Sequence, residues 1–291
     1  MFVVDGNAAI RRSYHVTADK KMTSDSGEST QAAFIFTKAL LRMIEQQRPS
    51  HLAIAVDRVG SKEARRRLYP EYKANRDKAL STDLDSDYFE QEKVAHQVIE
   101  ALGIPIISFP RYEADDVIAT LVRRNPSGCS RTVIVGKDKD FYQLLGDNVL
   151  MYDMFDGTVL TVAEIESKVG YELSLSRDIQ ALMGDSTDGV PGVKGIGKKT
   201  AVTLLTEYRT IAGVYDNLDK LKPGIRKKLE AGAATLGIMR TLVTLVDSLP
   251  LSLCPIPPLV MDNAWKASAI KEFNRLGFKS LLGPVGLMNV A

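Results

Sequence analysis

Short apolar, β-branched runs alternate with longer helical patterns along the first half of this chain, and this alternation constrains the fold more than any other feature. It is typical of α/β domains built on a mainly parallel sheet. The expected strands cover residues 2–4, 52–56, 104–107 and 132–135, and the helical patterns between them include residues 32–47 and 117–124. The sequence therefore predicts an α/β fold.

Carboxylates follow three of the four expected strands. Asp5 follows the first, Asp57 follows the second, and Asp138 and Asp140 come shortly after Val135. In open parallel sheets, ligands bind beyond the carboxyl ends of the strands. We therefore expect these four side chains to meet at one edge of the sheet.

A further group of acids stands where a helix should begin. Glu113, Asp115 and Asp116 directly precede the helical pattern of residues 117–124. The helix dipole explains one or two acids at such a position, but not their combination with strand-end aspartates. Clustered carboxylates repel one another unless a cation neutralises them, and oxygen ligands suit Mg²⁺ or Mn²⁺ better than Zn²⁺. The sequence therefore predicts a divalent-metal site.

Two more acids, Asp185 and Asp188, lie in a turn-like segment at residues 183–192. Turn chemistry by itself also accounts for these residue types. Added to the other seven, however, they supply enough carboxylates for two metal ions. Two ions about 4 Å apart clamp the attacking and leaving oxygens of a phosphodiester. This arrangement favours phosphodiester hydrolysis as the reaction class.

The glycine-rich segment at residues 192–199 resembles the start of a nucleotide-binding P-loop. Lys199, however, stands where that loop carries Ser or Thr, and no apolar strand precedes the segment. We favour a helix-hairpin-helix-like turn whose backbone N–H groups and lysines hold a DNA phosphate, and a plain helix-capping turn is the alternative for the glycines. The residues expected to contact DNA are Gly192, Lys194, Gly195, Gly197, Lys198 and Lys199.

Cations and tyrosines are interleaved in the segment that follows Asp57. Arg65, Tyr72, Lys73 and Arg76 are its main candidates for a functional role. A charged run is commonly just a solvated face. Cations nevertheless contact phosphates, and a tyrosine can stack on an unpaired base. The segment therefore suits single-stranded or frayed DNA.

Composition places the chain among globular proteins and leaves nucleic acid as a partner. The formal net charge is only +2, but a metal pocket would hold nine of the acids and leave the remaining surface decidedly basic. No apolar run approaches the roughly 20 residues of a membrane span, and no signal peptide is visible. Cys129 and Cys254 lack the spacing of a disulfide framework or zinc site. We expect a cytoplasmic protein without a membrane partner.

In their order and combination, these motifs resemble the 5′-nucleases, a family that comprises the 5′-to-3′ exonuclease domain of bacterial DNA polymerase I, the standalone phage 5′-exonucleases and the flap endonucleases. The matching segments cover residues 4–7, 56–57, 72–76, 112–116, 137–140, 183–192, 195–200 and 273–278. Two departures are Gly189, where the family usually has Asn, and the Gly136-Lys137 pair, where it has a Ser/Thr-rich approach to the aspartate.

The resemblance implies a PIN-like domain at residues 1–173, with a mainly parallel central sheet, helices on both faces and a helical arch at about 72–97. A helical DNA-binding part would follow at 174–291, with a helix-three-turn-helix at about 178–210. It implies a first metal site formed by Asp5, Asp57, Glu113, Asp115, Asp116 and Asp138. A second site would take Asp140, Asp185 and Asp188.

The resemblance also assigns roles to the cations. Lys73 and Arg76 would polarise the scissile phosphate, Tyr72 would stack near the cleaved strand, and Arg65 would contact DNA. Two or more Mg²⁺ ions are expected, for which Mn²⁺ can substitute, and a K⁺ ion is expected at the carbonyls of the loop at residues 190–197.

A structure-specific 5′-nuclease of DNA replication and repair is therefore the expected function. Its partners would be DNA with a 5′ flap, nick, overhang or single-stranded 5′ end, and RNA primers on DNA. The protein would act as a monomer, and its products would carry 5′-phosphates. No attached polymerase is expected. The alternatives are a PIN-like RNA-cutting nuclease, a non-catalytic binder of branched DNA and a P-loop NTPase.

Overall fold

A computed structural model of the chain describes residues 1–17, 21–75, 83–125, 127–251 and 256–287. Its centre is a six-stranded sheet in the order β3-β2-β1-β4-β5-β6, in which only β6 runs antiparallel to its neighbour. The strands are β1 (Phe2–Asp5), β2 (Leu52–Ala55), β3 (Ile106–Ile107), β4 (Thr132–Val135), β5 (Val149–Asp153) and β6 (Thr158–Leu160). The predicted parallel α/β sheet is confirmed, and β5 and β6 extend it beyond the prediction.

The strand order reverses direction at β1, and this reversal positions the candidate site. The chain leaves β1 toward β2 and β3 on one side and later adds β4 and β5 on the other. Val4 of β1 is in register with Ile54 of β2 and with Val135 of β4. The three strands therefore end side by side, at the point where open α/β sheets bind their ligands.

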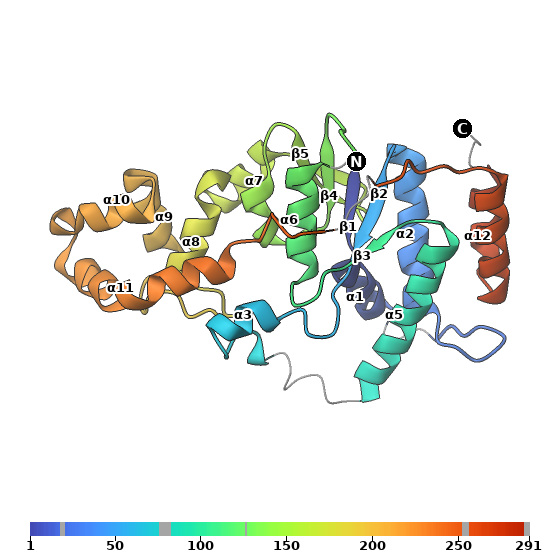
Figure 1. Ribbon diagram of the computed structural model, residues 1–291, viewed down its shortest axis with the longest axis horizontal. Helices are drawn as coiled ribbons and strands as arrows, with labels where there is room; N and C mark the ends of the chain where they lie inside the picture. The colour runs from blue at the N-terminus through green and yellow to red at the C-terminus, as the bar shows by residue number, and fades with distance from the viewer. Residues whose placement is uncertain (18–20, 76–82, 126, 252–255, 288–291) are drawn as a thin grey trace.

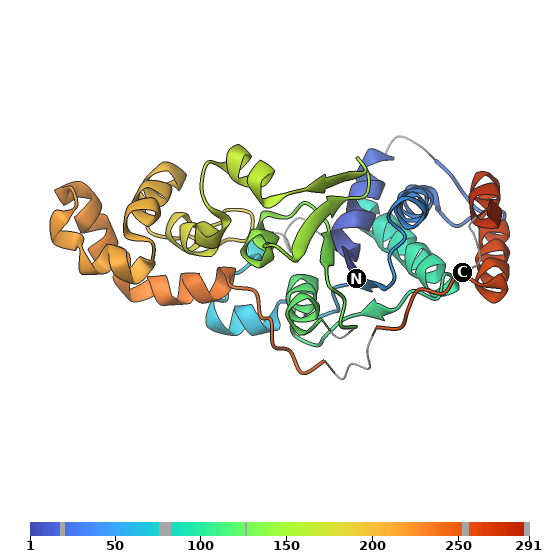
Figure 2. The same ribbon diagram turned by 90° about the horizontal axis from the view of Figure 1, so that it is seen from above.

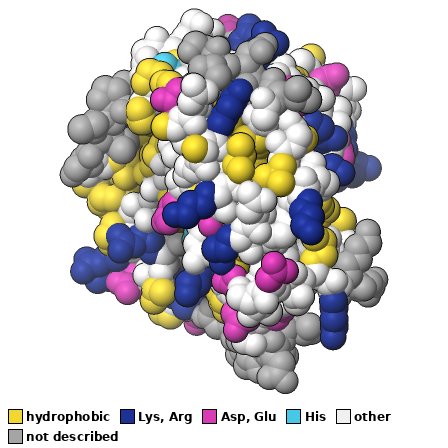
Figure 3. All heavy atoms as spheres, turned by 90° about the vertical axis from the view of Figure 1, so that its right-hand side faces the viewer, with side chains coloured by type: hydrophobic (Ala, Val, Ile, Leu, Met, Phe, Trp, Pro, Cys, Tyr) yellow, Lys and Arg dark blue, Asp and Glu magenta, His cyan; other side chains and the backbone are white. Residues whose placement is uncertain are grey.

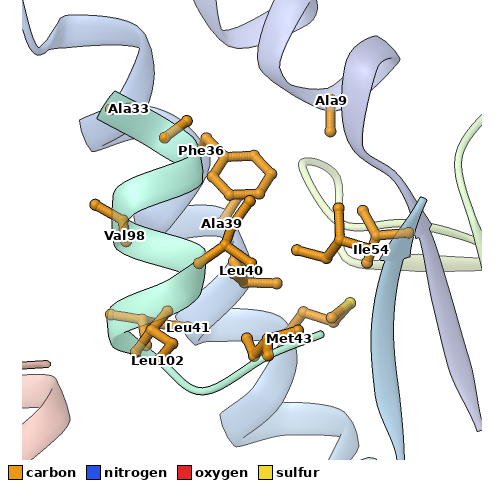
Figure 4. Packing of buried hydrophobic residues seen from close by; sticks show 14 of the residues in the cluster. Ala9, Ala33, Phe36, Ala39, Leu40, Leu41, Met43, Ile54, Val98 and Leu102 are labelled. Carbon is orange, nitrogen blue, oxygen red and sulfur yellow. The ribbon is translucent and has the colours of Figure 1, made fainter. Parts of the chain in front are cut away.

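Helices cover both faces of the sheet because alternate strand residues point to opposite faces. Val4 and Ile54 belong to the core shared with α1 (Gly6–Val16), α2 (Gln31–Gln47) and α5 (Asp83–Ala101). Figure 4 shows Ile54 pointing toward Phe36 and Leu40 of α2. Val3 belongs to the core on the other face, with α6 (Ala114–Arg124). Burial on both faces explains why these strands are continuous apolar runs.

The helices between residues 173 and 243 form a separate lobe at one end of the molecule (Figures 1 and 2). It has its own apolar core, which includes Leu182, Leu204 and Leu229. A short 3₁₀ helix, η1 (Lys139–Leu144), and helix α7 (Val162–Val169) lead toward it. Its elements are η2 (Leu173–Leu175), α8 (Ser176–Met183), α9 (Lys198–Tyr208), α10 (Ile211–Asp216), η3 (Leu218–Lys220) and α11 (Pro223–Val243).

The C-terminal helices do not belong to this lobe, which corrects the expectation of one helical part at 174–291. After α11 the chain runs back across the α/β body to its far end (Figure 1), where α12 (Asn263–Arg275) and α13 (Lys279–Leu287) lie. Phe273 and Phe278 join the core of α2 and α5, and the Trp265 indole donates a hydrogen bond to the Leu102 carbonyl at 2.7 Å. The apolar side chains of α12 and α13 therefore pack with α2 and α5 and not with the helical lobe.

The segment expected to form an arch is only partly described. Residues 76–82, which include Arg76, lie outside the described residues. Helix α5 follows from Asp83, and Val94 and Val98 in its second half are buried against the sheet layer. α3 (Glu63–Leu68) precedes the segment on the side of the helical lobe (Figure 1). Within the described ranges, no helix combines the length and apolar character needed to cross a membrane.

Candidate metal centre

A cleft of about 770 Å³ lies beyond the carboxyl ends of β1, β2 and β4. Residues of the α/β body line most of it, and the turn that follows α8 in the helical lobe supplies the rest. Eight of the nine predicted carboxylates line this one cleft: Asp5, Asp57, Glu113, Asp115, Asp138, Asp140, Asp185 and Asp188. The structure therefore brings together acids that are up to 183 positions apart in the sequence.

Local hydrogen bonds explain why aspartates stand where the strands end. Asp5 is the N-cap of α1 and accepts a hydrogen bond from the Ala8 N–H at 3.0 Å. Asp138 is the N-cap of η1 and accepts one from the Asp140 N–H at 2.9 Å. Asp57 accepts one from the Ala114 N–H, at 2.8 Å. Each aspartate satisfies helix N–H groups that would otherwise lack partners.

Asp116 does not line the cleft, so its expected role as a metal ligand is corrected. Its side chain is fully buried, and its two oxygens accept hydrogen bonds from the Arg65 guanidinium at 2.6 and 2.7 Å. The Val246 N–H also donates to it, at 2.8 Å. Asp116 therefore holds neighbouring segments together.

Arg65 is likewise buried, which corrects its expected contact with DNA. Besides Asp116, it donates to Glu113 at 3.1 Å and to the carbonyls of Leu242 and Thr244 at 2.9 and 3.3 Å. These bonds use every N–H of the guanidinium. Burial alone would lower the pKa of Arg65, but Asp116 outweighs it and raises that pKa above its ordinary value. Arg65 thus links α3, α6 and the end of α11.

Tyr72 points into the protein, so the expected stacking on DNA is also corrected. Its ring packs in the core of the helical lobe, and its side chain is only 3% exposed. The hydroxyl donates to Glu113 at 2.9 Å and lies 3.3 Å from an Asp188 oxygen. Tyr72 therefore orients two of the cleft carboxylates.

Lys73 does lie in the cleft, among the acids. Its ammonium group pairs with Glu113 and lies 3.4 Å from Asp188. The Lys73 N–H donates to the Asp188 carbonyl at 2.8 Å. Gly189 permits this approach, because a Cβ there would lie 3.0 Å from the Glu71 carbonyl oxygen and its φ is +71°. The Gly189 departure from the family pattern thus has a packing reason.

Two residues that the sequence did not single out organise the carboxylates further. Gln180 of α8 donates to Asp140 at 2.7 Å and to Asp185 at 3.0 Å. Asn7 accepts a hydrogen bond from the Asp57 N–H at 2.6 Å. Neutral amides carry no charge pattern that sequence inspection could detect. For Gln180, the available signal was its place near the end of the expected helix, shortly before Asp185.

Negatively charged side chains outnumber positively charged ones in the lining of the cleft. Burial and the charges of Asp138 and Asp57 raise the pKa of Asp5 to about 7. Burial and the charge of Asp138 raise the pKa of Asp140 to about 7 as well. Burial alone would also raise the pKa of Asp185, but the Lys139 ammonium, 2.7 Å away, outweighs it and lowers that pKa. The lysines therefore neutralise only part of the negative charge.

This donor set fits divalent cations that prefer oxygen ligands. In the part of the chain that the structure describes, no three acidic, His or Cys side chains yet converge closely enough to hold one ion. The ammonium groups of Lys73 and Lys139 instead pair with Glu113 and Asp185. Metal ions would replace these contacts and supply the missing positive charge.

The turn between α8 and α9 presents the glycine-rich segment. A Cβ on Gly192 would lie 2.3 Å from the Gly184 nitrogen, so Gly192 is needed for close backbone packing. Gly197 caps α9 without a side-chain hydrogen bond. Of the six residues in this segment that were predicted to contact DNA, five are exposed: Lys194, Gly195, Gly197, Lys198 and Lys199.

Most of the chain matches the models of two known protein domains. Residues 1–170 match the model of the 5′-3′ exonuclease N-terminal resolvase-like domain. Residues 173–259 match that of the 5′-3′ exonuclease C-terminal SAM fold. The chain belongs to the 5′-3′ exonuclease family. The resemblance seen in the sequence is thereby confirmed.

Two bacterial relatives illustrate how this family occurs. The chain is 37% identical to DNA polymerase I of Caldicellulosiruptor bescii over 100% of its length, but covers only 34% of that protein. It is 37% identical to the 5′-3′ exonuclease of Bacillus subtilis, with 87% of this chain and 85% of the relative covered. The chain thus spans about a third of the polymerase relative and most of the exonuclease relative.

Solved structures share the fold. The T5 5′-exonuclease with bound zinc superposes with a TM-score of 0.73 at 21% identity, over 94% of this chain and 98% of that one. The bacteriophage T5 flap endonuclease in complex with DNA and metal ions gives 0.68 at 20% identity, over 98% and 96% of the two chains. The family member described here therefore has the fold of these nucleases.

The Arg65 network yields a stability prediction. Replacing Arg65 by Met should lower the free energy of unfolding by about 3–5 kcal/mol, because Asp116 is left buried without its partner. The matched control is Arg67→Met on the same helix, whose side chain is 65% exposed and lies 4.0 Å from Glu63. That change should cost under about 1 kcal/mol. Urea unfolding measures both, and equal losses would contradict the assignment.

The raised pKa of Asp140 yields a pH prediction for the metal-free protein. Its carboxyl titrates at about 7 in the folded chain against 3.8 ordinarily, so between these values the folded state binds more protons than the unfolded state. The stability of the wild type relative to Asp140→Asn should therefore fall as pH rises from 4 to 8. At pH 8 the variant should be more stable by on the order of 1–2 kcal/mol.

Thermal unfolding with a chelator present measures this difference. Asp147→Asn, the same substitution at an exposed position away from the cleft, supplies the control for the change of side chain. An Asp140→Asn offset that is independent of pH would contradict the electrostatic account.

Proposed function

We propose that the chain is a divalent-metal-dependent, structure-specific 5′-nuclease. It would hydrolyse phosphodiester bonds at 5′ flaps and at the 5′ ends of branched or nicked DNA, and leave 5′-phosphates. The observation that carries this proposal is the convergence of eight carboxylates and Lys73 in one cleft beside the exposed α8–α9 turn. Membership of the 5′-3′ exonuclease family and the T5 complex with DNA and metal ions support it.

Two or more Mg²⁺ ions are the proposed cofactors, and Mn²⁺ should substitute for them. Asp5, Asp57, Glu113, Asp115 and Asp138 would hold one ion, and Asp140, Asp185 and Asp188 the other. When bound, such ions activate a water molecule and stabilise the charge on the attacking and leaving oxygens. The coarser dependence on divalent metal agrees with the T5 structures, which contain metal ions.

Lys73 would act directly on the substrate. Its ammonium group now pairs with Glu113 and Asp188 inside the cleft. Metal ions that take over these carboxylates would leave the ammonium to donate to a non-bridging oxygen of the scissile phosphate. Such a preorganised donor stabilises the charge that develops in the transition state. Arg76, which is not among the described residues, is proposed to assist Lys73.

The α8–α9 turn is the proposed grip on duplex DNA. Lys194, Lys198 and Lys199 are exposed around the start of α9, where helix N–H groups and the dipole favour a phosphate. By contrast, the end of the molecule that carries α12 shows Lys and Arg scattered among other side chains (Figure 3). A K⁺ ion at the turn is also proposed. It would compete with Lys228, which donates to the Gly195 carbonyl at 3.1 Å.

The biological setting follows from this chemistry. Proposed partners are DNA with a 5′ flap, nick, overhang or single-stranded 5′ end, and RNA primers paired with DNA. We place the activity in cytoplasmic replication and repair, performed by a monomer. A shorter RNA-cutting PIN-like nuclease fits less well, because residues 173–259 match a helical domain that belongs to the 5′-3′ exonucleases.

A cleavage assay tests the proposal. End-labelled 5′-flap, nicked and single-stranded DNA are incubated with the purified chain and either Mg²⁺ or EDTA. Cleavage of the flap should require the metal, and Asp138→Asn and Lys73→Met should each lower kcat by at least about 100-fold. The control Asp147→Asn, which lies away from the cleft-lining residues, should cleave like the wild type. Cleavage in EDTA, or full activity of Asp138→Asn, would overturn the proposal.

A further inference from the structure

A second, smaller hollow adjoins the metal cleft. It has a volume of about 210 Å³ and shares four lining residues with the cleft: Asp5, Ala8, Lys137 and Asp138. The two hollows lie along neighbouring faces of α1, because Asn7 and Arg11 line the cleft whereas Ala9 and Arg12 line the hollow. Two of the proposed metal ligands therefore form a common wall.

Apolar side chains form part of the remaining walls of the hollow, and hydrogen bonds hold the segment that carries two of them. Val135 and Met154 are buried, and Phe155 is half-buried. Asp153 accepts a hydrogen bond from the Phe155 N–H at 2.8 Å, and Arg42 donates to the Met154 carbonyl at 2.7 Å. These bonds fix the turn that follows β5. The hollow is therefore formed before any ligand arrives.

The charges at the rim of the hollow cancel one another. Arg12 contacts Asp153 at 2.9 Å, and Lys137 pairs with Asp153 and lies 2.6 Å from Asp156. Two cations thus face Asp153 and Asp156, and the common wall adds the carboxyl groups of Asp5 and Asp138, so an anion such as a phosphate would find no net attraction. The Arg12 guanidinium lies over the Phe155 ring, 4.5 Å from its centroid. A neutral, planar ring is the chemistry that suits these walls.

Size narrows the ligand further. Pockets for drug-sized ligands occupy about 300–1,000 Å³, so a hollow of about 210 Å³ suits one ring system rather than a whole nucleotide. If the scissile phosphate lies at Asp5 and Asp138, the nearest ring system in the substrate is the base of one of the two nucleotides that this phosphate joins. A base that is paired in a duplex cannot enter, because it must first leave the stack.

We propose that this hollow is a nucleobase subsite, in which Phe155 and Met154 receive the unpaired base next to the scissile phosphate. The inference rests on the proposed nuclease function and deepens it. Contact with the base would position the phosphate over the carboxylates, so unpaired ends would be cut in preference to continuous duplex. Stacking of a base on an aromatic side chain changes affinity by about 5- to 100-fold.

Kinetics on matched 5′-flap substrates test the subsite. One substrate is unmodified, and two others carry an abasic nucleotide on either side of the scissile phosphate. For the wild type, one abasic position should lower kcat/KM by about 5- to 100-fold and the other should not. Phe155→Ala and Phe155→Leu should lose activity on the unmodified flap and show no further loss with the abasic substrate. Val159→Ala, at an exposed position of β6, should behave like the wild type.

The outcomes separate the subsite from the proposed function. If the wild type cleaves no flap, the nuclease proposal itself fails. If it cleaves the unmodified flap but neither abasic position matters, or if Phe155→Leu retains the full abasic loss, the subsite alone is overturned. The thermal melting of each variant is measured to check that it folds. If Phe155→Ala does not fold, Phe155→Leu, which keeps an apolar side chain, provides the test.

Discussion

Mutual repulsion among eight carboxylates in one cleft is the physical constraint on which the rest of this structure depends. Each carboxylate loses hydration and gains negative neighbours, which is why burial and repulsion raise the pKa of Asp5 and Asp140 to about 7. The fold meets part of this cost with helix N–H groups and with the ammonium groups of Lys73 and Lys139. The proposed divalent ions would meet the remainder.

A second requirement is that two separately folded parts present their acids to the same cleft. Asp185 and Asp188 come from the helical lobe, and the other six acids come from the α/β body. Arg65 joins the two parts, since it binds Asp116 of α6 and the carbonyls of Leu242 and Thr244 at the end of α11. Tyr72 reinforces the joint by contacting Glu113 and Asp188. This buried ion pair and its partners hold the two parts against each other.

The sequence predicted those features that local patterns encode. The strands β1, β2 and β4 are continuous apolar runs that end at helix-capping or amide-binding aspartates, so both the sheet edge and its acids could be located. Strand β5 could not be located in this way, because Val149 and Leu150 at its start are only half-buried and its far neighbour β6 is short. The return of α12 to the α/β body depends on packing between distant segments, which a linear pattern does not record.

The candidate site shows the same limit. Arg65, Tyr72 and Asp116 were expected to contact DNA or metal because charged and aromatic residues look alike in a sequence whether they face solvent or one another. Only their burial and partners show that they hold the cleft together. Gln180 was overlooked for the opposite reason, since a neutral amide carries no charge signal.

The central claim is that this cleft is a binding centre for divalent metal ions, and calorimetric titration of the DNA-free protein with Mn²⁺ tests it most directly. At pH 7 the account predicts at least two bound ions per chain. It also predicts proton release, seen as a binding heat that depends on the ionisation enthalpy of the buffer, because Asp5 and Asp140 are partly protonated at that pH. Absence of saturable binding, or a single ion bound without proton release, would contradict the account.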